Sequence, residues 1–208
     1  MKKKGIIVSF EGIDGCGKST QVKLFCEYLD RKGTEYVLLN EPGGTKVGEK
    51  IRKILLDSRN TIGSLSELFL YLASRSQLIE ECIAPYVGKG GIVVIDRYID
   101  STMAYQGYGR GVSLDLIRYI HNAFVDVSLP DITFLIDAPA RNLLTVLKNK
   151  KKDRIEKESL EFQERVREGY LRIAQAEKQR IRIIERRTIT LTYEEIIKEW
   201  EKFNNGCK

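Results

Sequence analysis

The chain has 208 residues, 42% of them hydrophobic and 31% charged, which is enough for one sizeable core and too few for two ordinary domains. No run of about 18 apolar residues occurs and the apolar stretch behind the N-terminal lysines is short, so we expect no membrane span, no signal peptide and a cytoplasmic protein. The formal net charge of +6 fits anionic ligands such as nucleotides, although a lysine-rich solvated surface would give the same value.

Short apolar runs rich in β-branched residues alternate with longer segments of helical period. This alternation is typical of βαβ units and predicts an α/β fold with one parallel sheet. The expected strands are 5–10, 36–39, 92–95, 132–136 and 181–184. Helices are expected at 47–56, 65–87, 99–106, 113–126 and 158–178. Three more are expected: one that begins near residue 19, one that begins near residue 140, and a final helix that contains Trp200.

The five expected strands are apolar along their length, which predicts a sheet that is covered by helices on both faces. In such sheets ligands bind outside the carboxyl ends of the strands. Polar motifs that directly follow a strand are therefore the candidates for a functional site.

The four cysteines are Cys16, Cys26, Cys82 and Cys207, and no two of them form a CxxC pair. Because the chain has a single histidine, a structural zinc site is not expected, and we interpret the cysteines as reduced thiols.

A glycine-rich loop follows the first expected strand and precedes the first expected helix. Its sequence at 12–19 matches G-x-x-x-x-G-K-[ST], whose backbone N–H groups and helix N-terminus bind phosphate. Lys18 can reach the β and γ phosphates of ATP, and the Ser19 hydroxyl suits Mg²⁺, which prefers hard oxygen ligands. The expected ATP-binding residues are Gly12, Ile13, Asp14, Gly15, Cys16, Gly17, Lys18, Ser19 and Thr20. Cys16 is interpreted as a small filler of the loop, not a catalytic thiol.

This P-loop alone does not separate kinases from GTPases or ATPases. A GTPase typically carries a base-reading N-K-x-D segment after a later strand, whereas the fourth expected strand here is followed by DAP at 137–139. The third expected strand ends in DRY at 96–98. Asp96 can bind Mg²⁺ directly or through water, and Arg97 can hold a phosphate through two parallel hydrogen bonds, as a lysine cannot.

Six blocks together resemble thymidylate kinases, in the order of that family and over nearly the whole chain. They are FEGIDG at 10–15 with the P-loop, EPGGT at 41–45, YLASR at 71–75, DRY at 96–98 followed by Ser101, YQG at 105–107, and DRIE at 153–156. The resemblance implies a single P-loop kinase domain over 1–208, with a five-stranded sheet of P-loop NTPase type and a short lid near 148–156. It also implies transfer of the γ-phosphoryl of ATP to dTMP with Mg²⁺ and a homodimer packed through helices. We expect no nucleic-acid and no membrane partner.

The resemblance also implies roles for individual residues. Arg97 would grip the acceptor phosphate, Arg75 would hydrogen-bond the thymine edge and Tyr71 would stack on the ring, where the family usually has Phe. Asp14 would bind the 3′-hydroxyl of the deoxyribose, and Tyr105 would pack beneath the sugar and disfavour a ribose. The implied dTMP-binding residues are Asp14, Glu41, Pro42, Tyr71, Arg75, Arg97, Ser101, Tyr105 and Gln106. The implied catalytic residues are Lys18, Arg97, Arg154 and Asp14, and the implied metal ligands are Ser19 and Asp96.

The sequence departs from the family pattern in the lid and before EPGGT. The family usually brings an arginine from the lid to the transferred phosphoryl, but 148–152 is lysine-rich and lacks the usual glycine. Arg154 is the preferred candidate for that charge, and a lysine of 148–152 is the alternative. Asn40 stands where bacterial relatives usually have an arginine.

Two other functions stay open at this point. One is a kinase for another monophosphate such as dUMP or UMP, and the other is a nucleotide switch or DNA-associated ATPase. The combination of Tyr71, Arg75 and Tyr105 favours a kinase, because a switch needs no second base pocket. His121 is interpreted as a partly buried helix residue, since an already ionised acceptor phosphate needs no strong base.

Overall fold

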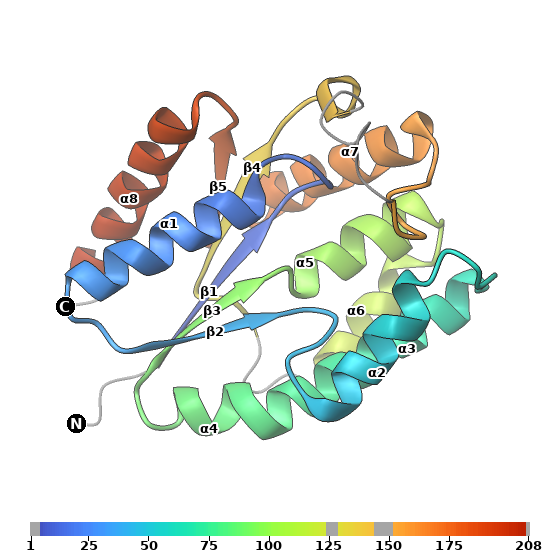
Figure 1. The fold of residues 1–208 in the computed structure, drawn as a ribbon, viewed down its shortest axis with the longest axis horizontal. Coiled ribbons are helices and arrows are strands. Elements are labelled where there is room, and N and C mark those ends of the chain that lie inside the picture. The colour runs from blue at the N-terminus through green and yellow to red at the C-terminus, as the bar shows by residue number, and fades with distance from the viewer. Residues whose placement is uncertain (1–4, 124–128, 144–151, 207–208) are drawn as a thin grey trace.

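The computed structural model describes residues 5–123, 129–143 and 152–206, and a five-stranded sheet crosses the middle of this part of the chain (Figure 1). The strands are β1 (Ile6–Glu11), β2 (Tyr36–Asn40), β3 (Ile92–Asp96), β4 (Ile132–Asp137) and β5 (Ile181–Glu185). All neighbouring strands are parallel, in the order β2-β3-β1-β4-β5. The predicted parallel α/β sheet is thus confirmed, and each strand lies within one residue of its expected bounds.

Eight α-helices connect or follow these strands in the described residues. They are α1 (Lys18–Arg31), α2 (Lys46–Leu56), α3 (Ser64–Leu78), α4 (Ala84–Val87), α5 (Ile99–Thr102), α6 (Leu114–Ala123), α7 (Leu160–Ala176) and α8 (Ile189–Gly206).

The central strand β1 is buried along its whole length because helices cover both faces of the sheet. On one face, Phe10 packs against Phe25 of α1, with ring centroids 5.3 Å apart, and Phe25 in turn contacts Trp200 of α8. Figure 1 shows α1 and α8 side by side on this face. On the opposite face, Ile7 packs with Leu78 at the end of α3 and with other residues that follow it.

Two of the expected helices contain a π-helical segment. The helix predicted at 65–87 is α3, a π-helical turn Ile79–Ile83 and α4 in succession. Pro85 explains the change, because its ring has no N–H and pushes against the carbonyl of the residue four positions earlier. The helix predicted at 99–106 is α5 followed by a π-helical segment Met103–Gly109, whose residues Met103 to Gly107 are all buried.

Two other expected helices lie partly outside the described residues. The helix predicted at 113–126 is α6, with positions 124–126 undescribed. The helix predicted from about 140 begins as a 3₁₀ turn, Ala140–Leu143, beyond which the chain is undescribed as far as 151.

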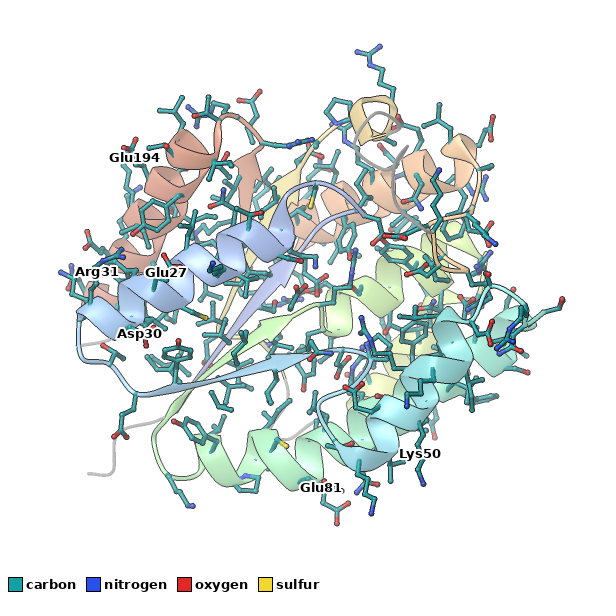
Figure 2. The ribbon with its side chains drawn as sticks, in the orientation of Figure 1. Glu27, Asp30, Arg31, Lys50, Glu81 and Glu194 are labelled. Carbon is teal, nitrogen blue, oxygen red and sulfur yellow. The ribbon has the colours of Figure 1, made fainter. Side chains whose placement is uncertain are left out.

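Most charged side chains of the helices lie on their outer surfaces. Figure 2 labels examples at the periphery of the molecule, among them Asp30 on α1, Lys50 on α2 and Glu194 on α8. Within the described ranges, none of the helices is long and apolar enough to cross a membrane. Cys16, Cys26 and Cys82 are free thiols, and Cys207 lies outside the described residues.

Candidate active site

The site forms where β1 and β3 end side by side. Phe10 pairs with Asp96 across the two strands, and the backbone N–H of Arg97 donates to the carbonyl of Phe10 at 3.0 Å. The glycine loop that follows β1 and the DRY segment that follows β3 are therefore neighbours, as the rule for parallel sheets predicts.

The glycine loop needs glycine at its first position and at its junction with α1. Gly12 has φ 142°, and a Cβ there would lie 2.6 Å from the carbonyl oxygen of Ile136. Gly17 has φ 94° and directly precedes α1, so the loop turns into the helix through a left-handed residue. Cys16 is buried in the loop, and burial raises the pKa of its thiol, so it has the properties of a filler and not of a nucleophile.

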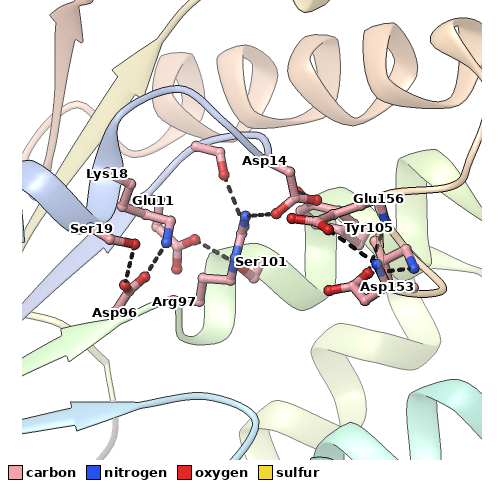
Figure 3. Close-up of polar contacts among 12 residues, drawn as sticks. Glu11, Asp14, Lys18, Ser19, Asp96, Arg97, Ser101, Tyr105, Asp153 and Glu156 are labelled. Carbon is pink, nitrogen blue, oxygen red and sulfur yellow. Dashed lines mark hydrogen bonds and ion pairs between the residues drawn. The ribbon is translucent and has the colours of Figure 1, made fainter. Parts of the chain in front are cut away.

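Lys18 and Ser19, at the start of α1, meet Asp96, at the end of β3 (Figure 3). Lys18 forms an ion pair with Asp96, and the Ser19 hydroxyl donates to the same carboxylate at 3.2 Å. Burial alone would raise the pKa of Asp96, but the charge and hydrogen bond of Lys18 lower it below its usual range. A hydroxyl and an ionised carboxylate this close together fit a hard divalent cation, which usually takes only one or two protein ligands when phosphates supply the others.

Arg97 stands between the glycine loop and the rest of the site in a left-handed backbone conformation, with φ 68°. Its guanidinium donates to Asp14 at 2.6 Å and to the carbonyl of Gly12 at 2.8 Å, and lies 5.0 Å from the centre of the Tyr105 ring. Such a conformation costs about 1–3 kcal/mol in a non-glycine residue and persists only where the surroundings hold it. The contacts to Asp14 and Gly12 are the surroundings that do so here.

Glu11 stabilises the DRY segment and the residues that follow it. Its buried carboxylate accepts hydrogen bonds from the backbone N–H of Tyr98 at 2.7 Å, from Ser101 at 2.6 Å and from Tyr170 at 2.9 Å. Burial and the nearby carboxylate of Asp100 raise the pKa of Glu11. The sequence analysis missed Glu11 and Tyr170. A carboxylate at the end of an apolar strand, just before the glycine loop, was a usable signal for Glu11, whereas Tyr170 comes from distant α7 without a local motif.

One cavity of about 450 Å³ joins these groups to the other predicted residues. The predicted residues that line it are Ile13, Asp14, Gly15, Gly17, Lys18, Ser19, Thr20, Glu41, Pro42, Tyr71, Arg75, Asp96, Arg97, Ser101, Tyr105 and Gln106. Gly12 and Cys16 are buried and do not line the cavity. Tyr105 donates to Asp14 at 3.1 Å, so Asp14 holds both Arg97 and Tyr105.

The far end of the cavity contains Tyr71 and Arg75, one helical turn apart on α3. Arg75 is 4% exposed, and its Nε and Nη2 donate to the same oxygen of Glu41 at 2.8 and 2.6 Å. Glu41 thus holds the arginine that was expected to meet the base. Among the lining residues that were not predicted are Arg52, which donates to the carbonyl of Pro42 at 2.7 Å, and Thr102, whose buried hydroxyl has no hydrogen-bond partner among the described residues.

The structure does not bring Arg154 to this cavity, contrary to the preferred expectation for the transferred phosphoryl. Arg154 forms an ion pair with Glu67 at 2.6 Å, and its Nε donates to the carbonyl of Leu55 at 2.7 Å, in the last turn of α2. The carbonyls at the end of a helix lack partners within the helix, and the buried Glu67 needs positive neighbours, so Arg154 satisfies both demands in this structure. Of the alternative lysines at 148–152, those at 148–151 lie outside the described residues, and Lys152 is described but does not line the cavity.

Glu67 is the centre of a charged network that connects Arg154 with Gln106, which lines the cavity, and with Arg110. It is fully buried and accepts hydrogen bonds from Gln106 at 2.8 Å and from Arg110 at 3.1 Å, besides its ion pair with Arg154. Burial would raise the pKa of Glu67, but the hydrogen bonds of Arg110 and Gln106 and the charges of both arginines lower it.

One cavity is lined by a glycine loop of the phosphate-binding pattern, by Arg97 beside it, and by Tyr71 and Arg75 of α3. This arrangement fits a P-loop kinase that acts on nucleoside monophosphates. A sequence model described as thymidylate kinase matches residues 10–196. The chain belongs to the thymidylate kinase family, which confirms the predicted class of enzyme and decides against a nucleotide switch.

Two relatives and a solved structure are similar to this chain over nearly its whole length. The thymidylate kinase of Caldanaerobacter subterraneus subsp. tengcongensis is 43% identical over 206 residues, 99% of both chains. That of Fervidobacterium nodosum is 44% identical over 198 residues, 95% of this chain and 100% of the relative. The crystal structure of thymidylate kinase from Ehrlichia chaffeensis has a TM-score of 0.78 at 36% identity and covers 95% of this chain and 99% of that chain.

Replacing Glu67 by glutamine tests the buried network. We expect Glu67→Gln to lower the free energy of unfolding at pH 7 by about 3 kcal/mol, because two largely enclosed arginines, Arg110 and Arg154, lose a fully buried carboxylate. The folded pKa of Glu67 is lowered, so its contribution is present above the ordinary glutamate pKa of 4.5 and is lost as the pH falls below it. Urea unfolding at several pH values measures this.

The matched control is Glu158→Gln, because Glu158 pairs with the same Arg110 at 2.6 Å but is 29% exposed. It should cost less than about 1 kcal/mol. Equal losses in the two variants, or a loss in Glu67→Gln that does not shrink in acid, would contradict this account of the network.

Proposed function

We propose that this protein transfers the γ-phosphoryl group of ATP to dTMP, which gives ADP and dTDP. The observation that carries the proposal is the cavity itself, which is lined by the glycine loop, by Arg97 beside that loop, and by Tyr71 and Arg75 of α3. Its volume of about 450 Å³ lies in the range of small-molecule sites.

The donor end binds the triphosphate of ATP. Backbone N–H groups of the loop and the N-terminus of α1 face the phosphates, and Lys18 leaves Asp96 to pair with the β and γ oxygens. Mg²⁺ is the divalent metal we propose, held by Ser19 and by Asp96 directly or through water; when bound, it neutralises charge on the β and γ oxygens.

The acceptor end binds dTMP. Arg97 exchanges Asp14 for the acceptor phosphate, which it can grip through two hydrogen bonds. Asp14 then becomes available for the 3′-hydroxyl of the deoxyribose, beside Tyr105. The thymine stacks on Tyr71 and meets Arg75. Because the attacking oxygen is already ionised, the residues supply alignment and positive charge and no general base.

The transferred phosphoryl group needs a positive charge and protection from water, and we assign both to the lid. We propose that the segment 148–156 closes over ATP and excludes water, and that a lysine of 148–152 replaces Arg154 in the role first expected of that arginine. Asp153 and Glu156 already line the cavity at the base of this segment.

A coupled assay for ADP release tests the substrate. With MgATP, we expect dTMP to give the highest kcat/KM among dTMP, dUMP, UMP, dCMP and AMP, because the slot pairs a stacking ring with an arginine donor and Tyr105 disfavours a ribose. A higher value for UMP or AMP, or ADP release that does not depend on any acceptor, would refute the proposal.

Substituting Arg97 by lysine tests the grip on the acceptor phosphate. Arg97→Lys should lower kcat/KM for dTMP by about 100-fold or more, because a lysine neither forms two parallel hydrogen bonds nor spreads its charge. The Kd for MgATP, measured by titration calorimetry, should change less than about threefold, since the glycine loop is intact. A loss of ATP affinity as large as the loss of turnover would show that Arg97 belongs to the donor end.

We also propose that the protein is a homodimer packed through α3 and α6. The two helices contact each other, and each exposes apolar side chains: Phe69 on α3 is 56% exposed and Tyr119 on α6 is 73% exposed. Exposed aromatic residues on neighbouring helices favour an interface over a solvated surface.

Light scattering after size exclusion tests the dimer. Phe69→Glu and Tyr119→Glu should each shift the wild-type dimer towards monomer, because a charge would be buried in the interface. Leu191→Glu on α8, where Leu191 is 44% exposed, is the control and should remain dimeric. A monomeric wild type would reject the proposed dimer.

A further inference from the structure

The donors of Arg75 are nearly all occupied. A guanidinium has five N–H donors. Nε and one N–H of Nη2 are taken by Glu41, and the carbonyl of Tyr98 accepts from Nη2 at 3.1 Å. The imidazole Nε2 of His121 lies 2.9 Å from Nη1. One N–H of Nη1 therefore remains for a ligand, and Arg75 lines the cavity.

His121 is a buried group that phosphoryl transfer does not use. It is the only histidine of the sequence, it lies on α6, and it is 7% exposed. Since an arginine can only donate, the His121 Nε2 must accept, which requires a neutral ring with its proton on Nδ1. Burial and the charge of Arg75 lower the pKa of His121 to about 3, so the ring stays neutral at physiological pH.

We propose that His121 is a positioning residue for base recognition: it orients Arg75 so that one N–H of Nη1 is directed at a carbonyl oxygen of the bound pyrimidine. This rests on the proposed function. Glu41 and the Tyr98 carbonyl hold the Nε and Nη2 edge of the guanidinium, and His121 holds Nη1. Without His121, both N–H groups of Nη1 lack an acceptor in a buried place, and the guanidinium can turn to find one.

A chemical preference follows from this arrangement. The position that distinguishes the pyrimidines is C4, where thymine and uracil carry a carbonyl oxygen and cytosine carries an amino group. An N–H donor pairs with the carbonyl oxygen and is mismatched with the amino group, so a Nη1–H fixed towards C4 favours thymine and uracil over cytosine. A guanidinium that can turn loses part of this discrimination. His121 would thus affect the selectivity for the base and not the rate of phosphoryl transfer.

Two substitutions separate this role from simple packing. His121→Leu removes the acceptor, and His121→Gln keeps an acceptor oxygen close to the position of Nε2. For His121→Leu we expect the KM for dTMP to rise and the ratio of kcat/KM for dTMP over dCMP to fall, each by about tenfold, the effect of losing one hydrogen bond to a charged group. Its kcat with dTMP and its KM for ATP should stay within about threefold of wild type, and His121→Gln should recover most of both losses.

Arg118→Ala is the control on the same helix, because Arg118 is 58% exposed, and it should behave as wild type. A second measurement uses the wild-type chain with any purification tag removed. Nitrogen-15 NMR of its single imidazole should show a neutral ring protonated on Nδ1, with no titration between about pH 5.5 and 8.

Equal kinetics for His121→Leu, His121→Gln and wild type would overturn the inference while the proposed function stands, and so would an imidazole that titrates near its ordinary pKa. Losses in His121→Leu that are the same for dTMP and dCMP and are not recovered by His121→Gln would show packing alone and also overturn it. A wild-type enzyme that does not phosphorylate dTMP would overturn the proposed function, and the inference with it.

Discussion

The parallel pairing of β1 with β3 is the constraint on which the site depends. It places the glycine loop and the DRY segment at one edge of the sheet, so that Lys18 meets Asp96 and Asp14 meets Arg97. The left-handed backbone of Arg97 turns the chain at this point, held by the carbonyl of Phe10 on its N–H. A shift in this pairing by one residue would send the loop and the arginine to opposite faces of the sheet.

Two cations of the site, Lys18 and Arg97, each have an anionic partner. Asp96 holds Lys18 and Asp14 holds Arg97, and phosphates of the two substrates can take the place of these carboxylates. The pair of Arg75 with Glu41 is different, because both side chains are buried and a base carries no charge that could displace Glu41. In the proposed reaction Lys18 and Arg97 therefore exchange a carboxylate for a phosphate, whereas the Arg75–Glu41 pair is already formed without the substrate. Such preorganisation is the main source of electrostatic catalysis and of selectivity.

Much of this arrangement could be predicted from the sequence, because its causes are local. The strands follow from apolar runs, and the residues of the glycine loop and of DRY follow strand ends. What could not be predicted depends on distant partners. Arg154 was a reasonable lid cation until Glu67, far away in the sequence, was seen to hold it. Likewise Tyr170 reaches Glu11 from another helix, and no spacing in the sequence pairs His121 with Arg75.

The central claim is that one cavity aligns two phosphate-bearing ligands, one on the glycine loop and one on Arg97. The most direct measurement is a crystal structure with dTMP, Mg²⁺ and a non-hydrolysable ATP analogue. We predict that Arg97 leaves Asp14 and binds the dTMP phosphate, which faces the terminal phosphate of the analogue on Lys18. If the dTMP phosphate instead lies elsewhere while Arg97 keeps its ion pair with Asp14, the account is contradicted.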